Sequence, residues 1–175
     1  MNKNGNNEGS VRKRANGTWE ARYSDGRDEN GHQIQSSVYG KTRKEAVEKL
    51  LDMVPSKYNG LTLCTGSLGA SPKNDMVEII KAAGDRIYFA HLRNVSINDR
   101  WFNETAHESD YGSLDMYEIV KALQEVGFDG YIRPDHGRMI WGEVARPGYG
   151  LYDRALGVSY LNGLWEAVEK SRKEK

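Results

Sequence analysis

Short apolar runs alternate with amphipathic stretches of helical spacing from residue 59 to the end of the chain. The runs have the length of buried strands and lie at 61–64, 86–94 and 130–136. The stretches carry apolar residues every three or four positions and predict helices at 75–83, 114–126 and about 151–170. Because buried strands that alternate with such helices are typical of a parallel sheet, we expect an α/β fold here.

Local signals refine these elements. Asn74 is the expected cap of the first helix, and the small residues at 65–69 predict a loop after the first strand. A polar insertion at 95–112 separates the second strand from the second helix. The last helix is expected to pack through an apolar stripe at a spacing of four, made of Leu156, Tyr160, Leu164 and Val168.

The first fifty residues show a different pattern. Extended stretches separated by turn signals lie at 10–14, 18–24 and 32–39. A helix is predicted at 43–51, where Thr42 and Glu45 have the spacing of a capping box. This pattern indicates a small three-stranded antiparallel sheet with one helix.

Charge separates the same two parts. Residues 1–50 hold ten Lys/Arg and seven Asp/Glu, a net charge of +3, and the remainder holds 15 and 18, a net charge of −3. Pro55 and Asn59-Gly60 mark a loop near the change. We therefore expect two domains, at 1–52 and 53–175.

Composition narrows the class of protein. The chain has 175 residues, 38% of them hydrophobic, and a net charge of zero. It has no apolar run near the roughly 18 residues of a membrane helix, and its first residues are polar. The single cysteine excludes an internal disulfide and suits a reducing compartment. We expect a cytoplasmic protein without a membrane partner.

Three potential metal ligands end the three predicted strands. Cys64, His91 and Asp135 each lie at the carboxyl end of an apolar run, and such ends share one mouth in a barrel or sheet of parallel strands. A thiolate, an imidazole and a carboxylate suit a borderline divalent cation. Taken singly, Cys64 also fits a buried apolar role, His91 a satisfied core histidine and Asp135 a helix cap.

Four motifs carry a resemblance to a known family. They are Leu-Thr-Leu-Cys-Thr-Gly-Ser-Leu-Gly at 61–69, His-Leu-Arg-Asn at 91–94, Arg-Pro-Asp-His-Gly at 133–137 and Arg-Pro-Gly-Tyr-Gly at 146–150. In this order and spacing they resemble the C-terminal part of mannonate dehydratase, over about residues 54–172. The resemblance implies a partial (β/α)8 TIM barrel with about three βα units. It also implies metal-dependent dehydration of D-mannonate to 2-keto-3-deoxy-D-gluconate, in hexuronate catabolism.

The same resemblance implies a site. Cys64, His91 and Asp135 would be three ligands of Mn²⁺, or of Fe²⁺, and the family's further histidine has no counterpart here. His136 and Tyr149 would be the general acid and base, in an order that the sequence leaves open. The substrate carboxylate would bind two arginines bidentately, Arg93 and Arg133. His107, in the polar insertion, is a weaker candidate for the same mouth.

The N-terminal part resembles a second family, the arm-binding domain of tyrosine recombinases, over about residues 9–51. The similar stretches are 9–14, 17–23 and 38–46. The resemblance implies a sheet that enters the DNA major groove through Arg12, Arg14, Arg22 and Gln35. The alternative is a solvated basic face, and a net charge of +3 favours only weak DNA binding.

The two resemblances together leave three possible functions for the chain. They are a metal-dependent lyase, a DNA-binding module with a passenger C-terminal part, or a non-functional fusion fragment. A whole barrel needs about 250 residues, so three units leave strand edges unpaired. Self-association would cover such edges. We expect the 175-residue chain to dehydrate D-mannonate weakly or not at all.

Overall fold

The computed structural model describes residues 10–53, 56–98 and 101–174, apart from the side chains of residues 10–12, 24, 25 and 43. The chain divides into two compact units, Met1–Asn59 and Gly60–Lys175. The division lies at Asn59-Gly60, later in the chain than the domain boundary expected between residues 52 and 53.

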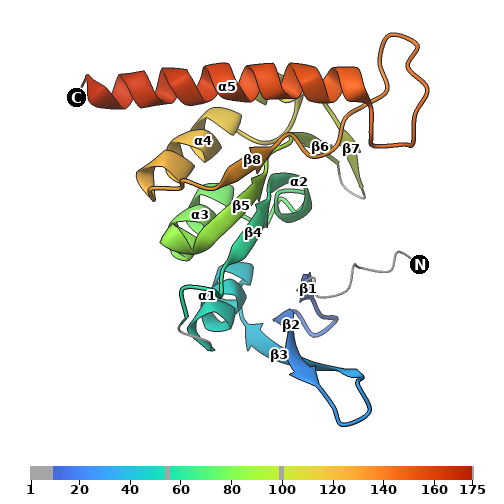
Figure 1. The fold of residues 1–175 in the computed structure, drawn as a ribbon, viewed down its shortest axis with the longest axis vertical. Coiled ribbons are helices and arrows are strands. Elements are labelled where there is room, and N and C mark those ends of the chain that lie inside the picture. Colours follow the sequence, from blue (N-terminus) through green and yellow to red (C-terminus); the bar gives the residue numbers. More distant parts are fainter. Residues whose placement is uncertain (1–9, 54–55, 99–100, 175) are drawn as a thin grey trace. The chain divides into compact units, whose positions relative to one another are not determined.

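The first unit is a three-stranded antiparallel sheet with one helix (Figure 1). Its elements are β1 (Ser10–Lys13), β2 (Trp19–Arg27), β3 (Gln33–Gly40) and α1 (Arg43–Met53), and β2 is central. Trp19 and Ala21 of β2 pack against Ala46 of α1, with Val38 and Leu50 beside them. Burial of these apolar side chains holds α1 on one face of the sheet.

Polar contacts at the start of α1 follow the predicted capping box with one change. The N–H of Glu45 donates to Thr42 Oγ1 at 3.1 Å, whereas the Glu45 carboxylate accepts from the N–H of Lys41 at 2.7 Å. A capping box returns that second bond to the cap residue itself. Strand β2 also extends past its predicted end at residue 24, through an irregular register between Ser24 and Arg27.

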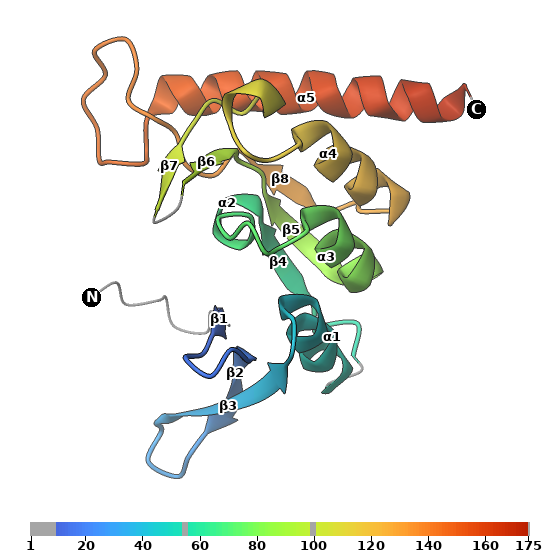
Figure 2. The same cartoon turned by 180° about the vertical axis from the view of Figure 1, so that it is seen from behind.

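The second unit is built on a three-stranded parallel sheet in the order β4-β5-β8. The strands are β4 (Leu61–Cys64), β5 (Ile87–His91) and β8 (Tyr131–Arg133). The main helices are α3 (Met76–Ala83), α4 (Met116–Glu125) and α5 (Leu151–Lys173). These helices lie side by side in both views (Figure 1, Figure 2), with α4 in contact with α3 and α5.

Register gives the two faces of this sheet different characters. Leu63 pairs with Ala90, which pairs with Ile132, and this row faces the helices, with Leu63 and Ala90 fully buried. The next row is formed by Cys64, His91 and Arg133 and points to the opposite face. Tyr131, which shares that face, is 81% exposed. Cys64 and His91 therefore lie on this open face of the sheet, and Asp135 follows β8.

Several local predictions differ from the structure. The first turn after β4 is a short helix, α2 (Thr65–Leu68), rather than a loop. The polar insertion forms a hairpin of β6 (Val95–Ile97) and β7 (Phe102–Glu104), and single 3-10 turns lie at Gly84–Arg86 and Ser109–Tyr111. Asp75, rather than Asn74, caps α3, because its side chain accepts from the N–H of Glu78 at 3.0 Å.

The buried face of α5 lies about one position beyond the predicted stripe. Leu156 is 48% exposed, and the buried residues are Asp153, Gly157, Leu161 and Val168. Only Val168 belongs to both sets. Within the described ranges, no helix is both long enough and apolar enough to cross a membrane.

Candidate metal centre

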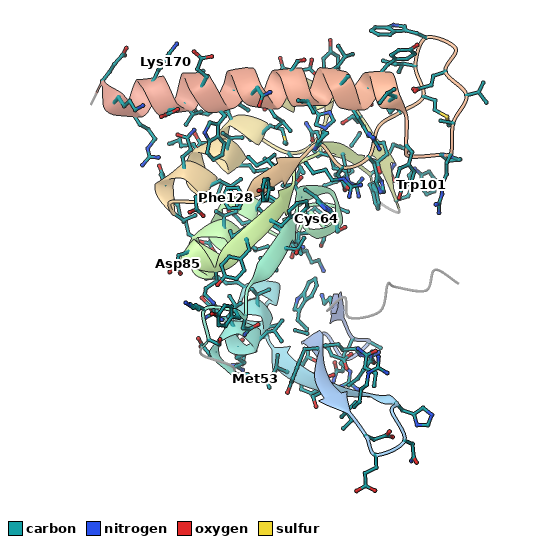
Figure 3. All side chains as sticks on the ribbon, viewed as in Figure 1. Met53, Cys64, Asp85, Trp101, Phe128 and Lys170 are labelled. Atoms are coloured by element: carbon teal, nitrogen blue, oxygen red, sulfur yellow. The ribbon has the colours of Figure 1, made fainter. Side chains whose placement is uncertain are left out.

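The three predicted ligands converge at the end of the parallel sheet. Their ligand atoms, from Cys64, His91 and Asp135, all lie within 4.8 Å of one another. Cys64 Sγ is 3.6 Å from Asp135 Oδ2, and His91 Nδ1 is 3.5 Å from Asp135 Oδ1. Asp135 is 4% exposed. Figure 3 shows Cys64 where β4 meets α2. Residues 71 positions apart in sequence are thus brought together, as predicted.

Backbone geometry places each ligand. Cys64 ends β4 and caps α2, because its sulfur accepts from the N–H of Ser67 at 3.4 Å. The adjacent Thr65 hydroxyl donates to the carbonyl of Arg93 at 2.7 Å and accepts from its N–H at 2.9 Å. This pair of bonds ties the end of β4 to the chain that leaves β5. Asp135 has a φ of 59°, a left-handed conformation that Asp tolerates better than most residues.

A buried ion-pair network surrounds the carboxylate of Asp135. Arg93 Nε lies 2.7 Å from Asp135 Oδ2, and the other end of the same guanidinium pairs with Glu104. Arg133 Nη2 lies 3.6 Å from Asp135 Oδ1. Gly66 makes room for the Arg93 guanidinium, since a Cβ there would lie 2.2 Å from it. Both predicted arginines therefore reach the site, but Arg93 is buried and Arg133 is partly exposed.

Electrostatics favour a charged Arg93 and a neutral His91. Burial alone would lower the pKa of Arg93, but the carboxylates of Glu104 and Asp135 and the neighbouring Cys64 raise it above its ordinary value. Burial lowers the pKa of His91 below 6.5, which Asp135 opposes and the two nearby arginines reinforce. A neutral imidazole keeps a lone pair on nitrogen at neutral pH, which a metal ion requires.

The two predicted acid and base residues lie next to each other. The rings of His136 and Tyr149 have centroids 5.8 Å apart. Backbone bonds between residue 137 and residues 148 and 150 close the loop that carries Tyr149. Arg146 lies over the Tyr149 ring, 5.2 Å from its centroid. His136 Nδ1 is 3.0 Å from a carboxylate oxygen of Glu104.

Glu104 is the member of this site that sequence reasoning missed. It joins Arg93 to His136, yet it belongs to a three-residue strand inside the polar insertion. It lies outside the four motifs that predicted the other site residues. The sequence shows only one acidic residue among several in the polar insertion between two motifs. His107, predicted as a weak candidate, is 2% exposed and contacts the backbone before Asp135.

Three of the four predicted DNA contacts lie on one face of the sheet in the first unit. Pairing of Arg22 with Ser37 and of Glu20 with Tyr39 places these residues opposite the face that holds Trp19 and Ala21. The Arg14 guanidinium lies over the Tyr39 ring on that side. Gln35, by register, belongs to the same face and is exposed. The side chain of Arg12 lies outside the described residues.

Comparison with known proteins identifies the family. The D-mannonate dehydratase (UxuA) family model matches residues 40–175. The chain belongs to this family. The match begins earlier than the resemblance near residue 54 and includes α1. The expected likeness of residues 9–51 to a recombinase domain finds no support in these matches.

Over the matched residues, members of the family are about half identical to this chain. The mannonate dehydratase of Thermotoga neapolitana is 58% identical over 134 residues, covering 75% of this chain and 37% of that protein. That of Streptococcus agalactiae serotype III is 54% identical over 144 residues, covering 78% and 41%. The crystal structure of mannonate dehydratase from Streptococcus suis serotype 2 matches with a TM-score of 0.71 and 47% identity, covering 74% and 38%. The chain thus spans about two fifths of the length of these relatives.

The residues present fit a divalent metal ion. A thiolate, a neutral imidazole and a carboxylate form a donor set that borderline cations accept. Arg93 holds Asp135 Oδ2 at 2.7 Å, whereas Oδ1 lies 3.5 Å from His91 Nδ1 and 3.6 Å from Arg133 Nη2, so Oδ1 is the less tightly held oxygen and the one that a metal would use. The donor atoms need to close by only about 1 Å to reach the spacing of a coordinated site.

Proposed function

We propose that this chain carries the metal-binding part of a mannonate dehydratase, which converts D-mannonate to 2-keto-3-deoxy-D-gluconate. The observation that carries the proposal is the convergence of Cys64, His91 and Asp135 on the open face of the parallel sheet. In this proposal β4, β5 and β8 are neighbouring strands of a (β/α)8 barrel, and their open face is its interior.

Cys64, His91 and Asp135 would hold the metal, Mn²⁺ first and Fe²⁺ second. When bound, such an ion stabilises the negative charge that develops as a proton leaves the carbon beside the substrate carboxylate. The network around Asp135 serves this purpose, because Arg93 fixes one carboxylate oxygen and leaves the other toward His91. Arg93 therefore suits positioning as well as the predicted binding of substrate.

His136 and Tyr149 would exchange protons with the substrate. Dehydration needs a base for the proton on the carbon next to the carboxylate and an acid for the hydroxyl that leaves the neighbouring carbon. Glu104 can only accept a hydrogen bond when ionised, so His136 Nδ1 carries the proton and Nε2 faces away from Glu104. Arg133 has an accessible guanidinium and suits the substrate carboxylate.

A chimaera tests this proposal. The matched C-terminal segment of the Streptococcus agalactiae mannonate dehydratase would be replaced by residues 40–175 of this chain. The chimaera should form 2-keto-3-deoxy-D-gluconate from D-mannonate with Mn²⁺. Asp135→Asn and His136→Gln should each lower kcat by about 100-fold or more. Lys170→Gln, on the exposed side of α5, is the matched control and should retain activity. Full activity in Asp135→Asn would refute the proposal.

DNA binding by the first unit is a second candidate function. The observation that favours it is the placement of Arg14, Arg22 and Gln35 on the sheet face opposite α1. Glu20 lies on the same face and pairs with Arg22, so the net positive charge of that face is smaller. We expect weak binding that weakens further with salt. Fluorescence anisotropy of a labelled duplex at low salt measures it, with Arg14→Gln expected to bind less tightly than Lys49→Gln. No change in anisotropy for any duplex would exclude this function.

A further inference from the structure

His107 is a buried histidine that none of the proposed chemical steps uses. It follows β7 in the chain and is 2% exposed. Its Nε2 lies 2.9 Å from the carbonyl oxygen of Pro134. Because a carbonyl oxygen can only accept, Nε2 must carry the proton and donate it to this bond. The bond joins the insertion between β5 and α4 to the peptide that immediately precedes Asp135.

Within the described residues, the backbone hydrogen bonds of the sheet stop before this peptide. The last backbone bond beyond the β5–β8 pairing runs from Leu92 N–H to the carbonyl of Arg133, at 2.8 Å. Pro134 has no N–H to donate. Asp135 then turns into the left-handed region with a φ of 59°, a conformation that needs support from its surroundings. The plane of the Pro134–Asp135 peptide and this φ together set the direction in which the Asp135 carboxylate points.

Helix α5 holds the His107 ring from the other side. A Cβ on Gly157 would lie 2.4 Å from Cε1, 2.6 Å from Nδ1 and 2.7 Å from Nε2 of His107. A glycine inside a helix destabilises it by roughly 0.5–1 kcal/mol relative to alanine, and here it leaves the room that the imidazole occupies. The ring is therefore fixed between α5 and the Pro134 carbonyl.

We propose that His107 is a positioning residue for the metal centre, which aims the Asp135 carboxylate by holding the Pro134–Asp135 peptide. Because the His107 ring also packs against Gly157 of α5, the position of α5 affects the direction of the Asp135 carboxylate. The inference rests on the proposed metal site. Partners that orient metal ligands typically change metal affinity by about 10- to 100-fold when they are removed, and His107 would act through the backbone of the ligand rather than through its side chain.

Two readouts test this role. The first needs no metal. Pro134 is the only proline that precedes an aspartate, so ¹³C-carbonyl proline with ¹⁵N-aspartate gives one coupled signal. His107→Leu removes the donor and should move this signal upfield, because a hydrogen bond deshields a carbonyl carbon. His107→Gln can place an N–H near the position of Nε2 and should restore much of the shift. Gly157→Ala displaces the ring and should also move the signal, which provides an independent variant.

The second readout is the absorption of the Co²⁺-loaded chain. His107→Leu should weaken Co²⁺ binding by about tenfold or more and His107→Gln by less. Leu161→Ala, a buried control on the same face of α5, should leave the affinity unchanged. Absence of thiolate–cobalt absorption in the unsubstituted chain would overturn the metal centre itself. With that absorption present, an unchanged affinity or proline signal in His107→Leu, or an equal loss in Leu161→Ala, would overturn the positioning role alone.

Discussion

Asp135 combines a buried carboxylate with an unusual backbone conformation. A buried charge is tolerated only when it is paired and hydrogen bonded, and the guanidinium of Arg93 provides both for one oxygen. Arg133 and His91 lie on the side of the other oxygen. Arg93 thus fixes one oxygen of the carboxylate, while the other lies 3.5 Å from His91 Nδ1.

A second buried aspartate, Asp153, allows a test of how much one buried ion pair stabilises the fold. Asp153 at the start of α5 is 2% exposed, and Arg138 donates to it from its backbone N–H at 2.7 Å and from Nη2 at 2.8 Å. Burial alone would raise the pKa of Asp153, but these bonds and the charge of Arg138 lower it below 3.8. Asp153→Asn should therefore lower the free energy of unfolding at pH 7 by about 1–2 kcal/mol, since Arg138 is partly exposed and screened.

The pH dependence of this effect follows from the direction of the shift. A depressed pKa in the folded state stabilises the protein above the pKa of the unfolded state, and the contribution disappears as the pH falls through the folded pKa. The difference in free energy of unfolding between the unsubstituted chain and Asp153→Asn should have its whole value at pH 7 and become smaller below about pH 4. Urea unfolding followed by tryptophan fluorescence measures this free energy at each pH. Glu166→Gln, an exposed acid on the same helix, is the control. A difference that grows on acidification would contradict the assignment.

At the scale of an element, α5 contains a matched pair of glycines. Gly157 faces His107, whereas a Cβ on Gly163 would meet nothing within 4 Å. Gly163→Ala should raise the thermal midpoint, because alanine in a helix is favoured over glycine by roughly 0.5–1 kcal/mol. Gly157→Ala should lower it, because the clash with a buried ring outweighs that gain. Circular dichroism melts of the two variants give the comparison. Equal stabilisation by both would show that the ring does not occupy this space.

The sequence predicts those helices, strands and site residues that periodic patterns or motifs mark. It places β4, β5 and β8, the helices between them and the convergence of Cys64 and His91, because residues at the ends of parallel strands share a register. It misses the hairpin of β6 and β7, because three-residue strands are too short to show alternation. Glu104 is missed for the same reason.

The predicted stripe of α5 fails for another physical reason. An apolar pattern assumes that buried positions are apolar. Asp153 is buried through its ion pair with Arg138, and Gly157 is buried through contact with His107. Neither residue contributes to a hydrophobic pattern. The pattern therefore selects Leu156 and its neighbours, one position away from the face that packs.

At the scale of the whole molecule, the family relation begins at residue 40, within the first compact unit. The match therefore crosses the loop between the units and includes α1. It gives no information on residues 1–39. The second unit carries the three converging ligands, the ion-pair network and the acid and base candidates.

A protein of these 175 residues alone should dehydrate D-mannonate weakly or not at all, even with added Mn²⁺. The chain spans about two fifths of its relatives, and the open face of the sheet is exposed at Tyr131. A misplacement of about 1 Å can already lower a rate about 100-fold. A coupled assay for 2-keto-3-deoxy-D-gluconate measures the activity, with the chimaera as the positive control. A rate for the isolated chain equal to that of the chimaera would show that three strands suffice.

Cys64, His91 and Asp135 are proposed to hold one metal ion together. X-ray absorption of the chain loaded with one equivalent of Zn²⁺, used as a probe ion, tests it most directly. Cys64 is the only cysteine, so a thiolate shell identifies it. We predict one sulfur at about 2.3 Å together with nitrogen and oxygen neighbours at about 2.0–2.2 Å. A first shell of nitrogen and oxygen alone would contradict the account.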